Sequence, residues 1–187
     1  MLWKENGEIS VLVAEEPFNQ GFFRKTFRAV KYTSHKVWVL KRCKKVALKN
    51  LYLGHEEHAR KEVQMHTVAQ RLEGNAPKEF GETFVYGKVY FSIFEGEPVT
   101  VEEYADGDFV KYVNNDGNCG APVPDDRANL QIFYDKFETL VHFTNSVTEE
   151  KMMLLDIQGS GFQLYDPEFE TKELLDNLVI STFVWVI

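Results

Sequence analysis

One stretch of the chain, residues 152–166, combines the side chains best suited to chemistry. The apolar run Met152–Leu155 ends on Asp156, Gln158 follows two residues later, and a second acid, Asp166, comes ten residues after the first. A strand that delivers a carboxylate, turns on glycines and returns with another carboxylate can build a site for Mg²⁺, which prefers oxygen ligands. From spacing alone, a β-hairpin with acidic turn residues explains the stretch equally well.

Basic residues in the first half of the chain could bind an anionic ligand. Gly21 lies in an expected turn between two strands, and Arg24 follows it, so this segment could fold over phosphates. The β-branched and aromatic run Val37–Cys43 predicts a strand, and Lys41 near its end could reach α- and β-phosphates. One glycine is a weak signal, because P-loop and dinucleotide fingerprints need several at fixed offsets. An ordinary edge-strand lysine remains the alternative for Lys41.

Apolar periodicity predicts two long helices. The first, Glu56–Leu72, carries a loose apolar stripe, and Glu62 in its first half could pair with Lys41. The second, Asn129–Thr144, has apolar residues at core spacing and His142 near its end.

The remaining elements are expected to be mostly strands. Alternating apolar residues and turn-forming residues predict strands within residues 9–15, 22–32, 83–94, 99–104 and 152–155. Residues 109–117 fit either a helix or an extended segment, residues 168–176 are compatible with the start of a helix, and residues 177–187 form a strongly β-prone tail.

Composition and charge describe a globular chain with two unlike halves. The chain is 44% hydrophobic, 27% charged and 14% aromatic, which fits one domain or two small lobes that share a cleft. Residues 1–94 contain 16 Lys and Arg against 10 Asp and Glu, whereas residues 95–187 contain 5 against 19. This split favours a cleft with cations for an anionic ligand on one side and carboxylates for metals on the other. Two solvated surfaces of different charge are the alternative.

The cysteines and the N-terminus favour an intracellular, cytoplasmic protein. The two cysteines, Cys43 and Cys119, do not make a disulfide framework. The N-terminal residues contain no long apolar segment, and no segment reaches the roughly 18–20 apolar residues of a membrane span. We therefore expect no signal peptide and no membrane span.

Four stretches, in order and spacing, resemble the atypical α-kinases, the family that includes elongation-factor-2 kinase and the myosin heavy chain kinases. They are Pro17–Lys25, Val39–Lys41, Val101–Gly117, and His142–Thr144 together with Leu155–Pro167. The resemblance covers residues 10 to about 170. It implies an α+β, two-lobed protein-kinase-like fold, with a β-rich N-terminal lobe and a truncated, mixed C-terminal lobe around ATP.

The resemblance assigns catalytic and metal-binding roles. Asp156 matches the catalytic aspartate, and Lys41 would contact the α- and β-phosphates and pair with Glu62. Gln158 and Asp166 match the pair that binds Mg²⁺. These roles agree with phosphoryl transfer, which needs positioned phosphates, neutralised charge and an acceptor for the hydroxyl proton.

The resemblance also implies a nucleotide site. Glu102 to Tyr104 would be a hinge that reads adenine through backbone groups, and Asn114 or Asn115 would lie near the phosphates or the catalytic aspartate. The expected ATP-binding residues are Gly21, Arg24, Lys41, Glu62, Glu102, Tyr104, Asn114 and Asn115.

The resemblance sets the expected domain boundaries and exposes one departure. A catalytic domain would span residues 1–176, with an N-terminal lobe to about residue 100, a hinge at 101–107 and a C-terminal lobe at 108–176, and residues 177–187 would be a divergent apolar tail. His142 matches the first ligand of the family's structural zinc, but no histidine follows it and no cysteine follows Cys119. Because structural zinc needs about four ligands, we expect His142 to be the remnant of an incomplete site without zinc.

The expected function is transfer of the γ-phosphate of Mg·ATP to serine or threonine of a protein substrate, with no nucleic-acid partner. Three accounts of the departure stay open: a truncated or alternatively spliced product, a pseudokinase that still binds nucleotide or serves as an interaction module, and a working kinase with a shortened C-terminal lobe. An α+β domain that binds an unrelated small anion is a further alternative.

Overall fold

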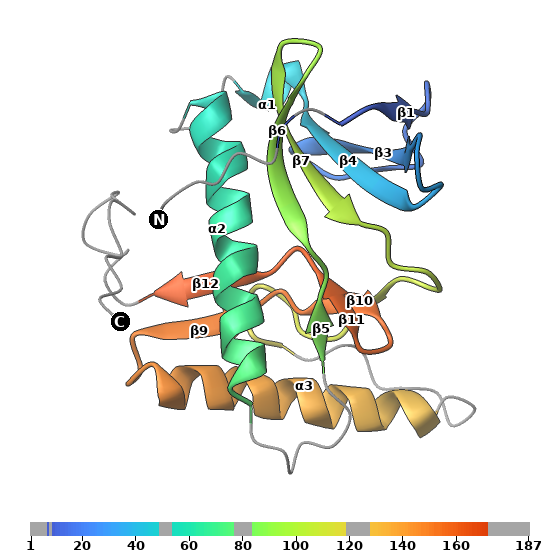
Figure 1. The fold of residues 1–187 in the computed structure, drawn as a ribbon. Coiled ribbons are helices and arrows are strands. Elements are labelled where there is room, and N and C mark those ends of the chain that lie inside the picture. Colours follow the sequence, from blue (N-terminus) through green and yellow to red (C-terminus); the bar gives the residue numbers. More distant parts are fainter. Residues whose placement is uncertain (1–6, 8, 49–53, 77–83, 119–127, 172–187) are drawn as a thin grey trace.

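The computed structural model describes residues 7, 9–48, 54–76, 84–118 and 128–171. A β-rich lobe, at the top of Figure 1, lies above a lower lobe of shorter strands, and the helix α3 runs along its base. The helix α2 extends beside both lobes. The expected α+β architecture with a β-rich N-terminal lobe is therefore confirmed.

The N-terminal lobe is built on a six-stranded antiparallel sheet in the order β1-β3-β4-β7-β6, with β2 paired to β3. Its strands are β1 (Val11–Val13), β2 (Asn19–Gln20), β3 (Arg24–Lys31), β4 (Val37–Cys43), β6 (Val89–Phe94) and β7 (Glu97–Glu103). The small helix α1 (Lys45–Leu48) follows β4. Ala29, Leu40 and Val99 form the buried core of this sheet. Since β4 lies between β3 and β7, a polar side chain on β4 is shielded by two neighbouring strands.

The helix α2 (His55–Gly74) packs against β5, β6 and β7. Its buried residues are Ala59, Val63, His66 and Ala69, which follow the i, i+4, i+7 spacing of one helix face. Three of these are apolar, as expected for a helix that covers a sheet. The fourth, His66, lies on the same face and is directed to the junction of the lobes.

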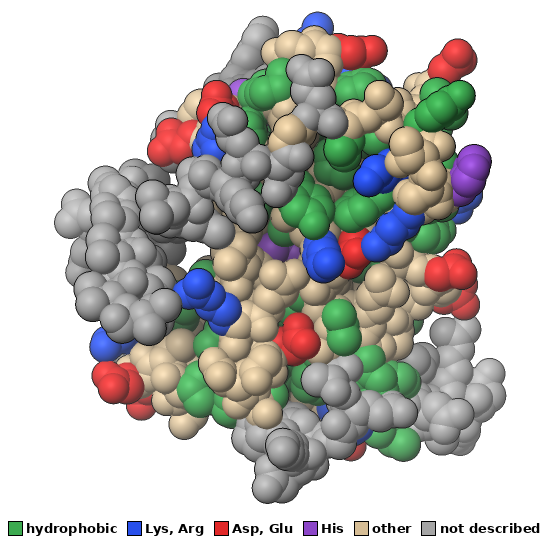
Figure 2. All heavy atoms as spheres, in the orientation of Figure 1, with side chains coloured by type: hydrophobic (Ala, Val, Ile, Leu, Met, Phe, Trp, Pro, Cys, Tyr) green, Lys and Arg blue, Asp and Glu red, His purple; other side chains and the backbone are tan. Residues whose placement is uncertain are grey.

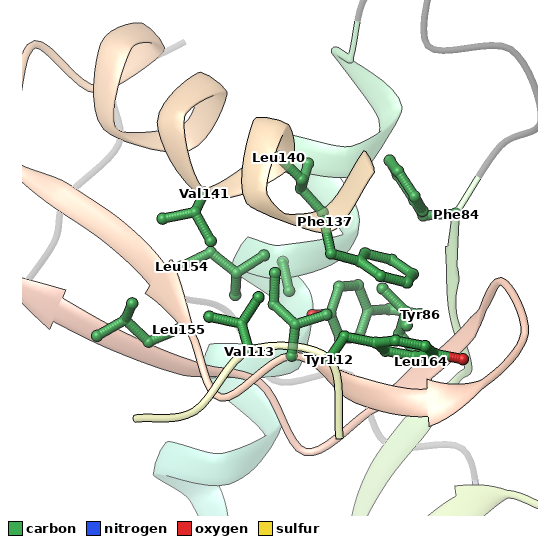
Figure 3. Packing of buried hydrophobic residues seen from close by; sticks show 12 residues of the cluster. Phe84, Tyr86, Tyr112, Val113, Phe137, Leu140, Val141, Leu154, Leu155 and Leu164 are labelled. Carbon is green, nitrogen blue, oxygen red and sulfur yellow. The ribbon is translucent and has the colours of Figure 1, made fainter. Parts of the chain in front are cut away.

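The lower lobe contains two small sheets and α3 (Ala128–Val147). The strands β5 (Val85–Tyr86), β11 (Gln163–Tyr165), β10 (Gln158–Ser160) and β8 (Val110–Lys111) form one sheet in that order, and β9 (Met152–Leu155) pairs with β12 (Glu168–Thr171). In Figure 3, Phe137, Leu140 and Val141 of α3 point toward Tyr112 and Leu154. The rings of Tyr112 and Phe137 lie 4.3 Å apart. This packing holds the strands that carry Asp156, Gln158 and Asp166 against α3.

Most predicted elements agree with the structure, with one difference. Residues 168–171 form the strand β12 rather than the start of a helix. Their exposure alternates, with Phe169 and Thr171 facing inward, and this strand pattern is completed by antiparallel pairing with β9. The segment of residues 109–117, left open between helix and strand, is extended and includes β8. The expected tail at 177–187 and Cys119 lie outside the described residues.

Candidate active site

The acids predicted to do chemistry lie at the open end of the β10–β11 hairpin, Asp156 before β10 and Asp166 directly after β11. Gln158 on β10 is opposite Tyr165 on β11, so Gln158 lies beside Asp166, the next residue. Asp156 and Asp166 both have left-handed backbones, with φ of 50° and 51°. This conformation is uncommon outside glycine but enriched for Asp, and it turns each carboxylate away from the path of its strand. Gly159 packs so closely on the Gln163 carbonyl that a Cβ there would overlap it.

Lys41 lies at the centre of the site. Only 7% of it is exposed, and its Nζ lies 2.8 Å from Glu102 Oε2 and 2.5 Å from Asp166 Oδ1. Lys41 is opposite Thr100 on β7, so Glu102, two residues on, projects from the same face of the sheet. Burial lowers the pKa of Lys41, but the carboxylates of Asp166 and Glu102 more than offset burial and raise the pKa above its ordinary value. The lysine is therefore charged.

Asp166 is held by a second cation, Arg24. The guanidinium of Arg24 donates to Glu62 Oε2 at 2.9 Å and to Asp166 Oδ1 at 3.3 Å. Burial acts to raise the pKa of Asp166, but Lys41 and then Arg24 outweigh it and hold the pKa below its usual range. The ion pair expected between Lys41 and Glu62 is thus replaced by two others, Lys41 with Glu102 and Arg24 with Glu62. The helix α2 is therefore joined to the site by the ion pair of Glu62 with Arg24.

Asp156 has a cation of its own. The Nζ of Lys111, on β8, lies 2.5 Å from Asp156 Oδ1, and the Asp156 backbone N–H donates to the Asn114 carbonyl at 3.4 Å. Asn114 therefore lies beside Asp156. Asn115 is exposed and lines a surface pocket together with Leu155 and Glu168. The resemblance did not single out Lys111, although its register opposite Gln158 places it in the site.

Gly21 and Tyr104, two residues expected to bind ATP, lie in the connections next to β3 and β7. Gly21 is exposed in the turn before β3, where its N–H donates to the Arg24 carbonyl at 3.0 Å. Tyr104 follows the end of β7, and its hydroxyl accepts a hydrogen bond from Arg28 at 3.1 Å. Glu102 lies within β7, which pairs with strands on both sides, so this residue presents its carboxylate to the site.

Two histidines have contrasting positions. His142 is exposed on α3, and no group of three candidate metal ligands in the described part of the chain includes it. His66 is only 2% exposed and lies near Glu102 and Asp166. Burial lowers the pKa of His66, although the two carboxylates act to raise it. Within α2, His66 lies in the same stripe as the buried apolar residues Ala59, Val63 and Ala69, so helix periodicity alone does not reveal its proximity to the acids.

Charges of opposite sign therefore meet between the lobes. Figure 2 shows basic and acidic side chains next to one another in the middle of this face. Lys41 and Arg24 come from the N-terminal half, and Asp156 and Asp166 come from the other. Such a set can bind phosphate groups, a divalent cation and a hydroxyl proton, which are the requirements of phosphoryl transfer.

The two lobes, with this set of charged residues at their junction, form a protein-kinase-like fold. The chain belongs to the alpha-kinase family, whose model matches residues 19–177. The fold is similar to that of a catalytic-domain variant of myosin heavy chain kinase A, with a TM-score of 0.71, 18% identity, and coverage of 88% of this chain and 76% of that chain. The same kinase domain solved with AMP-PNP gives a TM-score of 0.68, 17% identity, and coverage of 88% and 75%.

Two further relatives extend the comparison. An alpha kinase from Entamoeba histolytica is 19% identical, with a TM-score of 0.66 and coverage of 90% of this chain and 68% of that chain. The human transient receptor potential cation channel subfamily M member 6 is 27% identical over 120 residues, which is 61% of this chain and 6% of the channel. The match therefore spans a small part of that protein. None of the described helices of this chain is long and apolar enough to cross a membrane.

Proposed function

We propose that this chain binds Mg·ATP between its lobes and transfers the γ-phosphate to serine or threonine of a protein substrate. The observation that carries the proposal is the buried Lys41, held between Glu102 and Asp166 at the junction of the lobes. Membership of the alpha-kinase family and similarity to a kinase domain that binds AMP-PNP support it.

The phosphates would be bound by Lys41 and Arg24. Both cations contact Asp166, and both come from neighbouring strands of the N-terminal sheet, next to the turn at Gly21. A phosphate group that enters here can accept hydrogen bonds from the ammonium and the guanidinium, and charge-assisted bonds of this kind are strong. Lys41 would then exchange a carboxylate for a phosphate oxygen.

The donor set beside the phosphates fits Mg²⁺. Gln158 and Asp166 offer an amide and a carboxylate oxygen from adjacent strands, and hard oxygen donors are the ligands that Mg²⁺ prefers. When bound, Mg²⁺ would neutralise charge on the transferred phosphoryl group. Asp166 must release part of its contact with Lys41 and Arg24 for this role.

Asp156 would accept the proton of the substrate hydroxyl. It is nearly buried, and the Asn114 carbonyl and Lys111 Nζ hold its backbone and its carboxylate in place. A base that removes a proton in phosphoryl transfer needs this positioning more than it needs an unusual basicity. Lys111 also compensates the charge of the carboxylate while no substrate is present.

The same proposal divides the chain at the end of β7. The strand ends at Glu103 and β8 begins at Val110, so the segment between them connects the lobes and fits a hinge at 101–107. Tyr104 lies beyond the paired strand, and we expect its backbone to face adenine. The N-terminal lobe would then end near residue 100 and the C-terminal lobe would begin at residue 108.

A pair of assays tests the proposal. Mg·ATP should raise the melting temperature of the purified chain, and radiolabelled ATP should label the chain or an added protein at serine or threonine. Asp156→Asn should abolish labelling and keep the ATP-dependent shift, whereas Lys41→Met should lose both. His142→Ala, an exposed position, should keep both. A shift without any labelling would identify a nucleotide-binding pseudokinase, and no shift would refute the proposal.

A further inference from the structure

His66 is a buried polar residue that the proposed phosphoryl transfer does not use. It lies on the covered face of α2, and neither of its ring nitrogens has a hydrogen-bond partner among the described residues. Its ring lies nearly perpendicular to that of Tyr86, with the centroids 6.2 Å apart. Buried polar groups are normally hydrogen-bonded. Two unpaired nitrogens on one buried ring therefore indicate that a bound ligand satisfies at least one of them.

Two carboxylates face this histidine. One ligand atom each from His66, Glu102 and Asp166 all lie within 4.8 Å of one another. The three residues come from α2, from β7 and from the end of β11, so three packed elements hold them in place. Both Glu102 and His66 are buried, which excludes an accidental surface cluster of acids.

The donor set differs from that of the proposed Mg²⁺ site. One imidazole nitrogen and two carboxylate oxygens suit Zn²⁺, Co²⁺ or Mn²⁺, whereas Mg²⁺ is bound almost entirely by oxygen. We propose that His66, Glu102 and Asp166 form a transition-metal site at the base of the lobe junction, and that Lys41 competes with the metal for the two carboxylates.

Competition follows from the contacts of Lys41. Its ammonium already contacts Glu102 at 2.8 Å and Asp166 at 2.5 Å. Ligand atoms around a tetrahedral metal lie about 3.4 Å apart, given metal–ligand distances near 2.1 Å. The ligand atoms, which lie within 4.8 Å of one another, must therefore approach by up to about 1.4 Å, and this narrows the space between the carboxylates that the ammonium uses. A metal ion and the Lys41 ammonium therefore compete for the same carboxylates, and their positive charges repel each other.

The inference goes beyond phosphate transfer, although it shares Asp166 with the proposed Mg²⁺ pair. A metal ion at His66 would occupy that carboxylate and remove the lysine from its place in the nucleotide site. We expect such a metal to oppose the binding of Mg·ATP rather than to assist it. The site is thus an inhibitory one, with a ligand chemistry separate from that of the substrate.

The test is a titration of the full chain with cobalt(II) chloride without nucleotide, followed by visible d–d absorption and calorimetry. We expect Lys41→Met to bind Co²⁺ at least about tenfold more tightly than the wild type, because the competing cation is gone. His66→Leu should weaken binding at least about tenfold in the wild-type and the Lys41→Met backgrounds, in line with the loss of a ligand. His142→Leu, at the exposed histidine of α3, should bind like the wild type.

Two results would overturn the inference. One is equal Co²⁺ affinity of Lys41→Met and the double variant Lys41→Met/His66→Leu. The other is a loss of binding in His142→Leu, which would place the metal elsewhere. The melting temperature of each variant verifies its folding. Since the readout is metal binding without ATP, an inactive chain leaves the inference standing, and a failed metal site leaves the proposed kinase function standing.

Discussion

Removal of the Lys41 ammonium should destabilise the fold far more than removal of the neighbouring cation on the same strand. In Lys41→Met, the carboxylates of Glu102 and Asp166 lose the cation between them, and Glu102 is left buried with an uncompensated charge. Breaking a buried ion pair in this way costs about 3–5 kcal/mol. Arg24 still contacts Asp166 and lessens the loss on that side, so we expect about 3 kcal/mol, at the lower end of that range.

The assay is urea denaturation monitored by tryptophan fluorescence, and Arg42→Met is the matched control. Arg42 is the next residue on β4 and pairs with Glu95, whose side chain is 68% exposed, so its removal should cost at most about 1 kcal/mol. The double variant Lys41→Met/Glu102→Gln should recover about 2 kcal/mol of the loss, because residues in contact couple by this order. Equal destabilisation by the Lys41 and Arg42 substitutions would refute the reasoning.

Three further predictions concern other residues. Burial first, and then Arg24, lowers the pKa of His58 to about 4, so its neutral form stabilises the fold at neutral pH, and this stability is lost as pH falls from about 6.5 toward 4. His58→Gln should flatten that part of a stability-versus-pH curve, and an unchanged slope would contradict the assignment. Gly159→Ala should abolish the ATP-dependent rise in melting temperature, because the added Cβ overlaps the Gln163 carbonyl. The control Gly161→Ala, at φ of 56° in open space, should cost about 1 kcal/mol of stability. A normal ATP-dependent rise in Gly159→Ala would show that the hairpin tolerates displacement. In metal-free buffer, His66→Leu should raise the free energy of unfolding by about 1 kcal/mol, since two unpaired buried nitrogens are replaced by apolar groups. A lower stability of this variant in chemical denaturation would indicate that the imidazole has a hydrogen-bond partner.

The elements that carry the site could be predicted because they depend on local sequence. The strand Val37–Cys43 has the predicted bounds, and α2 and α3 begin and end within a few residues of expectation. Lys41 and Asp166 were found by residue type and position, and the structure brings them into contact. The assignment of roles to them remains a prediction that the assays above address.

The pairing of charges could not be predicted because it depends on register and on contacts between lobes. Glu102 was expected to contribute its backbone, but the register of β4 on β7 places its carboxylate on Lys41. Glu62 contacts Arg24 because α2 approaches the sheet near the start of β3. Residues 168–171 adopt a strand only because β9 offers a partner edge. Each of these outcomes depends on tertiary packing, which local propensity does not contain.

Arg24 couples the position of α2 to the binding of a ligand at Asp166. One guanidinium joins the start of β3 to Glu62 on α2 and to Asp166 beyond β11. A ligand that takes Asp166 away removes one of the two partners of that guanidinium and leaves Arg24 balanced by Glu62 alone. Occupancy at Asp166 and the placement of α2 are therefore thermodynamically linked, and by reciprocity any partner that shifts α2 must change the affinity of the site.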